Sequence, residues 1–255
     1  MMNLTERRRA MLEEMGVRLW LPAAPVAAAP APAPVAAAAA ANPSLAAGAA
    51  PGTPAVERPS GIAQMDWPAL REAVAACTAC GLCRGRTRTV FGVGNARAQW
   101  MIVGEAPGEQ EDLRGEPFVG KSGQLLDNML RALGLTRGEA APAQQVYIAN
   151  TVKCRPPGNR NPEPAELAQC EPYLVRQIEL VRPRIILAMG RFAVQSLLRS
   201  SEPIGRLRGR VHRYEGVPLV VTYHPAYLLR NPDDKARSWE DLCLAREVAS
   251  QPEPG

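Results

Sequence analysis

Four short runs of β-branched and apolar residues alternate with segments of helical periodicity from residue 100 onward. The runs are Trp100 to Gly104, Val146 to Ala149, Ile185 to Met189 and Leu219 to Tyr223; the helical segments are Ser122 to Leu133, Pro164 to Val181 and Arg191 to Leu198. Apolar strands that alternate with helices are typical of a parallel sheet covered on both faces. We therefore predict an α/β fold, a three-layer α/β/α sandwich with a central four-stranded, mainly parallel sheet.

The first part of the chain has a different composition. From Pro22 to Ser60 it is almost entirely Ala and Pro, and no charged residue occurs between Arg18 and Glu57. Repeated Pro blocks regular structure, and Ala buries too little apolar surface to offset chain entropy. We predict a disordered linker over 23–60 and a single folded domain over 61–250.

The segment before the linker, residues 1–22, has a helical pattern of its own. The sequence predicts a short amphipathic helix from Thr5 to about Met15 that ends at Gly16. Leu19, Trp20 and Leu21 follow it. Such side chains on a tethered peptide are typical anchors for a partner's groove, so we expect a protein-docking segment. The alternative is that they dock on the protein's own domain.

The charge distribution indicates a polyanionic partner. The formal net charge is +5, and Arg residues cluster as Arg84, Arg86 and Arg88, as Arg155 and Arg160, and as Arg206, Arg208 and Arg210. Several such clusters suit nucleic acid, although any one of them could be ordinary solvated surface. No run approaches a membrane span. We expect a monomeric cytoplasmic protein that binds DNA and no membrane.

Polar residues follow the predicted strands. Glu105 lies in GEAPGE after the first strand, Asn150 ends the second, MGR ends the third, and His224 lies in HPAYLLR after the fourth. In such sheets ligands bind at the carboxyl ends of the strands. A carboxylate, an amide and an imidazole at one sheet edge predict a functional site.

The stretch GEPFVGKS, residues 115–122, matches the phosphate-binding pattern G-x-x-x-x-G-K-S. That loop must leave a buried strand and enter a helix directly. Here the preceding residues are EQEDLR, which cannot be a buried strand. We interpret the match as coincidental, which leaves an ATPase as the weakest of the functional hypotheses.

The cysteines form two groups that suit a metal centre. Cys77, Cys80 and Cys83 make C-x-x-C-x-x-C, and Cys154 and Cys170 come later. Thiols in such groups are typical of a tetrahedral zinc or an iron–sulfur cluster. Spacing alone does not choose between these, nor does it exclude Cys83 as a ligand. Cys243 is expected to be unligated.

These stretches together resemble a family 4 uracil-DNA glycosylase, the iron–sulfur class of bacteria and archaea. The matching segments are CTACGLCRGRTRTVFG, MIVGEAPGEQEDLRGEPFVGKSGQLLD, YIANTVKCRPP with NRNP, Cys170, and HPAYLLRNP. They occur in family order and cover about Cys77 to Leu242. The resemblance implies an enzyme of base excision repair that flips uracil out of DNA and hydrolyses its N-glycosidic bond. Such an enzyme leaves an abasic site in the DNA. No Lys nucleophile stands out in these motifs, so cleavage of the strand is not expected.

The resemblance also implies roles for single residues. Four cysteines match the ligands of a [4Fe–4S] cluster, with Cys83 outside the set: Cys77, Cys80, Cys154 and Cys170. In the substrate site, Phe118 stacks on the extruded uracil, Asn150 reads its Watson–Crick edge, and His224 hydrogen-bonds its O2. Glu105 lies near the sugar and Glu111 near the base, with Gly104 and Ala106 beside them.

Some roles stay open. Ala106 stands where the wider superfamily can carry a water-activating Asp, so the general base is undecided. Leu228 or Leu229 is expected to fill the vacated stack, with Arg230 and Arg155 on the DNA backbone. Taken singly, Phe118 could be core, Asn150 a turn former and His224 a satisfied histidine. The rival function is a non-catalytic, metal-stabilised DNA-binding module associated with replication machinery.

Overall fold

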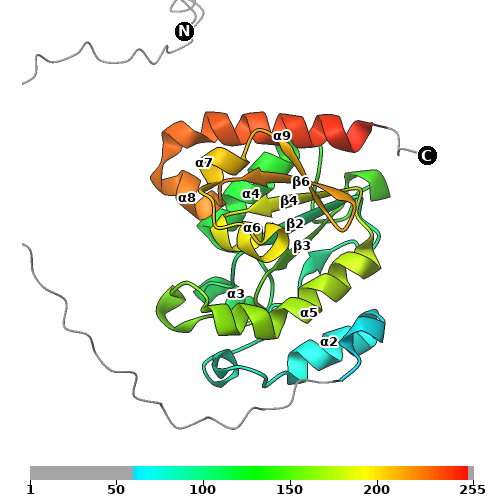
Figure 1. Ribbon diagram of the computed structural model, residues 1–255, viewed down its shortest axis with the longest axis vertical. Coiled ribbons are helices and arrows are strands. Elements are labelled where there is room, and N and C mark those ends of the chain that lie inside the picture. Colours follow the sequence, from blue (N-terminus) through cyan, green and yellow to red (C-terminus); the bar gives the residue numbers. More distant parts are fainter. Residues whose placement is uncertain (1–59, 252–255) are drawn as a thin grey trace, which may run out of the picture. The chain divides into compact units, whose positions relative to one another are not determined.

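The computed structural model describes residues 60–251. The docking segment predicted over 1–22 and the linker predicted up to residue 59 lie outside the described residues. The described part is an α/β domain built on one six-stranded sheet (Figure 1). No helix between residues 60 and 251 is long and apolar enough to cross a membrane.

The sheet has the strand order β1-β3-β2-β4-β6-β5. The strands are β1 (Val93–Gly94), β2 (Trp100–Gly104), β3 (Val146–Asn150), β4 (Ile185–Met189), β5 (Val211–Tyr214) and β6 (Val217–Thr222). The four inner strands are parallel to one another and are the four that the sequence predicts. The prediction of a mainly parallel α/β sheet is therefore confirmed.

The two outer strands are absent from the sequence prediction. β1 and β5 pair antiparallel with β3 and β6, respectively. β1 is only two residues long, and β5 reads VHRY with exposed and half-buried positions in turn. Neither strand has an apolar run, because an edge strand has solvent beside it and is held by its ladder of hydrogen bonds.

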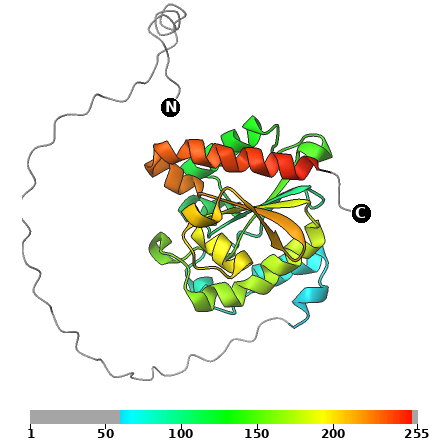
Figure 2. The same cartoon turned by 45° about the horizontal axis from the view of Figure 1, so that its top comes forward.

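Helices cover both faces of the sheet. They are α2 (Trp67–Ala76), α3 (Glu109–Arg114), α4 (Lys121–Ala132), α5 (Pro164–Val181), α6 (Arg191–Leu198), α7 (Ile204–Leu207), α8 (Pro225–Arg230) and α9 (Lys235–Ser250). Short 3-10 turns join them at Ile62–Gln64, Gly81–Arg84, Pro142–Gln144, Pro157–Asn159 and Pro232–Asp234. Helices α5 and α6 pack on one face, and α4 and α9 on the other (Figures 1 and 2).

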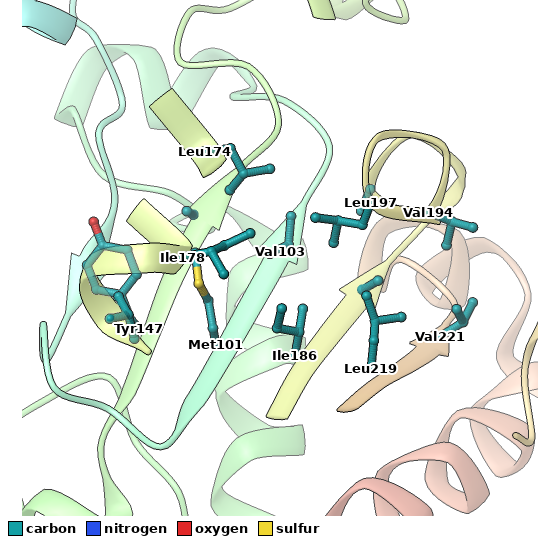
Figure 3. Close-up of a cluster of buried hydrophobic side chains, with 14 of the residues drawn as sticks. Met101, Val103, Tyr147, Leu174, Ile178, Ile186, Val194, Leu197, Leu219 and Val221 are labelled. Carbon is teal, nitrogen blue, oxygen red and sulfur yellow. The ribbon is translucent and has the colours of Figure 1, made fainter. Parts of the chain in front are cut away.

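Alternate residues of the inner strands fill the two cores. Met101, Val103, Ile186 and Leu219 point toward α5 and α6, where Leu174 and Leu197 belong to the same buried cluster (Figure 3). The intervening residues, such as Ile102 and Leu187, pack against α4 and α9. Because side chains alternate across a strand, these continuous apolar runs supply both faces at once. The two cores lie on the two faces of the sheet, and the carboxyl edge at which the inner strands end adjoins both of them.

The register of the sheet brings the predicted polar residues together. Gly104 at the end of β2 pairs with Asn150 at the end of β3, and Met189 of β4 pairs with Thr222 of β6. Since these strands are parallel, the residues that follow them share one edge. That edge is where the candidate site lies.

The GEPFVGKS stretch joins two helices. Gly115 ends α3 in the left-handed conformation, and α4 begins at Lys121. A phosphate-binding loop of the predicted kind connects a strand to a helix, so this segment has the wrong context. The interpretation of the match as coincidental agrees with the structure.

The arginine clusters divide into exposed and inward-facing members. Arg86 donates to the backbone oxygen of Cys77 at 2.8 Å. Arg208 pairs with the buried carboxylate of Asp241 at 3.0 Å. Arg160 forms hydrogen bonds of 2.9 and 2.6 Å to the two carboxylate oxygens of Glu166. Arg160 is nevertheless exposed, as are Arg84, Arg88, Arg206 and Arg210. Only part of the predicted basic surface is thus available to a polyanion.

Candidate active site and cysteine cavity

A cavity of about 980 Å³ opens at the carboxyl edge of the inner strands. Residues predicted for the site from separate segments line it together: Glu105, Ala106, Glu111, Phe118, Asn150, His224 and Arg230. They come from the ends of β2 and β3, from α3 and the segment between α3 and α4, and from α8 with its cap. The predicted convergence of a carboxylate, an amide and an imidazole is what the structure shows.

Gly104 permits the closest contacts in this site. A β-carbon at this position would lie 2.5 Å from the Asn150 side-chain oxygen and 2.5 Å from Cζ of Phe118. Real β-carbons do not approach other heavy atoms this closely. Glycine is therefore the only residue type at position 104 that allows the Asn150 amide and the Phe118 ring to approach each other over the end of β2.

Asn150 presents an unpaired acceptor. The residue is 2% exposed, and its Oδ1 is buried without a hydrogen-bond partner in the part of the chain that the structure describes. A buried polar atom with no partner costs about 1–3 kcal/mol. A ligand N–H group at this position would remove that cost, so the amide is arranged for binding rather than for fold stability.

Phe118 is held in place by a strained turn. Its φ of 55° lies in the left-handed region, which is uncommon for a bulky residue. A β-carbon on Gly123 would lie 1.7 Å from the Phe118 carbonyl oxygen, so α4 starts close under this turn. The ring stacks against the His224 imidazole, with centroids 5.3 Å apart and planes 26° from parallel.

Glu111 ties down the turn that carries Phe118. One carboxylate oxygen accepts from the backbone N–H groups of Val119 and Gly120 at 2.9 and 3.1 Å, and the other from Gly108 at 3.1 Å. The side chain is buried and lines the cavity. Its observed contacts are thus to backbone on both sides of α3, which makes it a positioning group for the Phe118 ring.

His224 is set up as a neutral hydrogen-bond donor. Its Nδ1 accepts from the backbone N–H of Ala226 at 3.2 Å, which leaves the proton of the neutral ring on Nε2. Loss of solvation, helped by nearby Arg230, lowers the pKa of His224 to about 4. At neutral pH the imidazole therefore carries no charge and can donate a hydrogen bond into the cavity.

Among residues 60–251, the Glu105 side chain forms no hydrogen bond or ion pair at close range, and its nearest charged influence is Arg191. Burial raises the pKa of its carboxyl above the usual value, and Arg191 partly offsets this. Its backbone oxygen accepts from the Thr151 hydroxyl at 2.5 Å, which fixes the segment after β2 against the one after β3. The side chain lines the cavity beside Ala106, where an acidic residue is absent.

The cysteines surround a second, smaller cavity beside α2 and α5. Five of them line it: Cys77, Cys80, Cys83, Cys154 and Cys170. Burial raises the pKa of Cys154 to about 11 and that of Cys170 to about 12, so both are thiols in the absence of a bound cation. The four predicted ligands are together, and Cys83 shares their cavity. Cys243 lies apart on α9, as expected for an unligated residue.

The lining of this cavity contains two cations and no carboxylate. Arg86 donates to the Cys154 sulfur at 3.2 Å. Lys153 is 1% exposed; its backbone N–H donates to the Cys170 sulfur at 3.2 Å, and its ammonium donates to the Asn150 backbone oxygen at 2.8 Å. Thiols beside buried positive charge suit a group of negative overall charge, such as a metal bound by four thiolates.

The thiols are spread around the cavity rather than gathered on one point. Among residues 60–251, no three His, Cys, Asp or Glu side chains are placed to hold a single metal ion. Tetrahedral zinc needs its sulfur ligands at about 2.3 Å from one centre. In a cubane cluster each thiolate binds a different iron, so its ligands lie farther apart, and the donor set fits such a cluster.

Sequence comparison identifies the family to which this fold and site belong. The model of the uracil DNA glycosylase superfamily matches residues 91–244, which is more than half of the chain. The chain belongs to the uracil DNA glycosylase superfamily. The match spans the strands, the cavity residues from Glu105 to His224, and two of the cavity cysteines.

Individual relatives place the chain in the type-4 branch of this superfamily. A type-4 uracil-DNA glycosylase of Archaeoglobus fulgidus is 41% identical over 189 residues, covering 71% of this chain and 92% of the relative. One from Saccharolobus solfataricus is 42% identical and covers 71% and 85%. One from Thermotoga maritima is 43% identical and covers 65% and 84%.

The exposure of their side chains distinguishes Leu228 from Leu229, the two leucines predicted as alternatives for filling the space of a flipped base in a superfamily member of this kind. Leu228 is a buried residue of α8, 1% exposed, so its side chain does not reach the surface in this structure, which favours the other alternative. Leu229 is 46% exposed and next to the exposed Arg230. Arg155 donates to the Asn159 side chain at 2.7 Å, so its predicted backbone contact competes with a hydrogen bond within its own loop.

Some residues of this superfamily site escaped the sequence analysis. Arg191 lines the cavity from the start of α6, and its charge acts to lower the pKa of the Glu105 carboxyl. The sequence signal that could have found it is its position in MGR, directly after a predicted strand. Tyr223 and Tyr227 line the cavity on either side of the His224 cap. Both belong to the stretch that carries HPAYLLR. Nothing in the sequence pattern marked Lys153 as a link between the two cavities.

Proposed function

We propose that this protein is a monofunctional uracil-DNA glycosylase of DNA repair, which extrudes uracil from DNA and hydrolyses its N-glycosidic bond. The observation that carries the proposal is the unpaired, buried acceptor of Asn150 beside the neutral donor of His224. A pyrimidine with an N3–H donor and an O2 acceptor is complementary to that pair.

Recognition of uracil follows from three contacts. The base stacks on Phe118, and its N3–H donates to the Asn150 oxygen. The Asn150 amide N–H group then faces uracil O4, whereas cytosine carries an amino group there and lacks the N3 proton. Because a mismatched donor leaves a buried group unpaired, discrimination against cytosine follows from the amide. Access requires the nucleotide to leave the duplex stack at a cost of a few kcal/mol.

Bond cleavage separates charge between base and sugar. The C1′–N1 bond breaks, and its electron pair moves into the uracil ring, where O2 takes up negative charge. The Nε2–H of His224 donates to that oxygen, and the Glu105 carboxylate stabilises the positive sugar. Water then bonds to C1′ and loses a proton, and uracil gains one, which leaves an abasic site. In this scheme the Glu105 carboxylate receives the water proton.

We infer that Cys77, Cys80, Cys154 and Cys170 hold a [4Fe–4S] cluster. The support is the thiol-lined cavity with Arg86 and Lys153 on its walls and no carboxylate. When bound, the cluster joins the segment before the sheet to the segment after β3, which is a structural contribution. The chemistry of excision stays with the residues of the larger cavity.

The test is excision by the purified protein. A single-stranded oligonucleotide with one uracil should release free uracil and break at that position only after alkali treatment. The same oligonucleotide with thymine at that position is the matched control. Binding of both oligonucleotides with no release of uracil would instead support the non-catalytic DNA-binding module. Breakage without alkali would contradict the monofunctional assignment.

Two further proposals rest on the sequence alone. We propose that residues 1–22 dock a partner of the repair or replication machinery and that the protein works as a cytoplasmic monomer. Deleting 1–22 should leave excision from short oligonucleotides and the melting temperature unchanged. A lower melting temperature would show that the segment belongs to the folded domain.

A further inference from the structure

Two stacked tyrosines line the active-site cavity next to the catalytic histidine. The rings of Tyr223 and Tyr227 have centroids 5.0 Å apart and planes 19° from parallel. Tyr223 directly precedes His224, and the backbone N–H of Tyr227 donates to the His224 backbone oxygen at 2.9 Å. Both side chains are half-buried and face the cavity. The mechanism above uses neither of them.

The hydroxyl of Tyr227 is anchored by a residue outside the cavity lining. The Tyr227 hydroxyl donates to Asp234 at 2.7 Å, and Arg237 donates to the other oxygen of the same carboxylate at 2.8 Å. A hydrogen bond with Tyr223 and the charge of Asp234 raise the pKa of Arg237. The Asp234–Arg237 pair thus holds Tyr227 directly, and Arg237 also interacts with Tyr223. Their rings form a stacking surface that is ordered before any ligand arrives, which lowers the entropy cost of binding.

The cavity is much larger than one pyrimidine. Its volume of about 980 Å³ is that of a site for a drug-sized ligand. Uracil occupies the part next to Phe118, Asn150 and His224. The remaining lining includes the two tyrosines and the Pro203–Gly205 turn, and a β-carbon on Gly205 would lie 3.9 Å from the Tyr223 hydroxyl. The part of the cavity that one pyrimidine leaves unfilled is therefore lined by the two tyrosines and this turn.

The charges around this space suit a nucleic-acid strand. Arg191 and Arg230 line the same cavity and are exposed. A strand that delivers uracil to His224 must continue past it, with a phosphate on each side of the flipped nucleotide. Tyr223 directly precedes His224 and lines the same cavity, so a strand whose uracil contacts His224 passes beside the tyrosine pair.

We propose that the Tyr223–Tyr227 pair is a stacking subsite for the nucleobase adjacent to the excised uracil on the same strand. The inference rests on the proposed function, because it takes uracil-containing DNA as the ligand. Aromatic stacking tolerates any base, so the subsite adds affinity and fixes the strand without narrowing the sequence context. It also favours single-stranded or locally opened DNA, in which the neighbouring base is free to leave its own stack.

The experiment combines changes in the DNA with changes in the protein. Single-stranded oligonucleotides carry one uracil and a tetrahydrofuran abasic analogue in place of the base on its 5′ side, on its 3′ side, or on neither. For the wild type, kcat/KM should fall about tenfold for one of the two modified oligonucleotides, which identifies the side. Tyr223→Leu and Tyr227→Leu should lose about tenfold on the unmodified oligonucleotide and show no further loss on that modified one.

Tyr227→Phe is the matched control, because it keeps the ring and removes the hydroxyl bond to Asp234. It should still distinguish the two oligonucleotides, and melting temperatures show whether each variant is folded. Equal wild-type rates on all three oligonucleotides would overturn the subsite. So would leucine variants that remain as sensitive to the missing base as the wild type.

Failure of the proposed function gives a different result. In that case no oligonucleotide releases uracil, and the stacking surface is tested by fluorescence anisotropy on the same set. Weaker binding by Tyr227→Leu than by Tyr227→Phe, seen only when the neighbouring base is present, would support the subsite. Equal binding by the two variants would overturn it.

Discussion

The Asn150 side-chain oxygen lies 2.5 Å from the point that a β-carbon on Gly104 would occupy, and the Phe118 ring reaches the same point. Gly104 and Asn150 are paired in the ladder between β2 and β3, so neither strand can move away on its own. The Asn150 amide and the Phe118 ring, which we propose to bind the base, therefore take their positions from the core of the fold. A rigid slot of this kind is what preorganised recognition requires.

Gly104→Ala should abolish uracil excision while leaving most of the fold intact. The added methyl displaces the Asn150 amide and the Phe118 ring, and we expect kcat/KM to fall by about 10²-fold or more. Gly138→Ala is the matched control, because a β-carbon there meets only the Thr136 hydroxyl at 3.6 Å. Excision assays with melting curves separate the two effects. Near-normal excision by Gly104→Ala would contradict the slot.

Asn150→Ala and His224→Ala should each reduce excision by about 10²-fold, since each removes a preorganised contact to the leaving base. Affinity for uracil-containing DNA should change little, because contacts to phosphates dominate it. The measurements are single-turnover excision and fluorescence anisotropy at fixed salt. Wild-type rates in either folded variant would refute the site assignment.

Excision should decline at acidic pH because of Glu105 and not because of His224. Burial raises the pKa of the Glu105 carboxyl above 4.5, so the carboxylate is lost at a higher pH than for a free Glu. The pKa of His224 is lowered to about 4, so its imidazole stays mostly neutral until the pH falls close to that value. The wild-type rate should thus fall as pH drops, with its midpoint above 4.5 and no separate step at the usual pKa of a free histidine.

Glu105→Gln provides the control for this pH dependence. It should lower the rate by about 10²-fold and remove the acidic decline, since the amide does not ionise. A decline of unchanged midpoint in that variant would assign the titration to another group. Single-turnover rates from pH 4 to 8 on one oligonucleotide measure both profiles.

Cys154→Ser should abolish the iron–sulfur cluster, whereas Cys83→Ser should keep it. The readouts are iron content and the broad absorption at about 400 nm expected of such a cluster. The comparison is sharp because both cysteines line the same cavity and only their assigned roles differ. Stoichiometric zinc without iron in anaerobically purified protein would count decisively against the cluster. Loss of iron from Cys83→Ser would add that thiol to the ligand set.

The inner sheet could be predicted from the sequence because burial on two faces imposes continuous apolar runs. Pro164–Val181 and Arg191–Leu198 were also placed correctly, since their helical periodicity is bounded by Pro and Gly. The edge strands could not be predicted in this way, because β5 is held by its pairing with β6 and has little apolar character. Leu228 and Leu229 are equivalent in sequence, and only the packing of α8 tells them apart.

The residue types of the candidate site could be predicted from polar strand ends and motifs, whereas its chemical state could not. The tautomer of His224 depends on one backbone hydrogen bond. The side-chain oxygen of Asn150 has no hydrogen-bond partner among residues 60–251, and this depends on which groups pack beside it. The inward turn of Arg86 toward Cys154 depends on the cysteine cavity, which forms only when distant segments meet. These properties belong to the tertiary structure.

The short segment from Asn150 to Cys154 has a consequence for how this gene can vary. Its first residue is the amide proposed to read the base, and its last is a cysteine of the thiol-lined cavity. Lys153 is hydrogen-bonded to Asn150 at the start of the segment and to Cys170, a second cysteine of that cavity. An inserted or deleted codon here would shift either the amide or the thiol out of place, with no loop to absorb the change. Among homologous genes, length differences should therefore collect after Pro156 and be missing between these two residues.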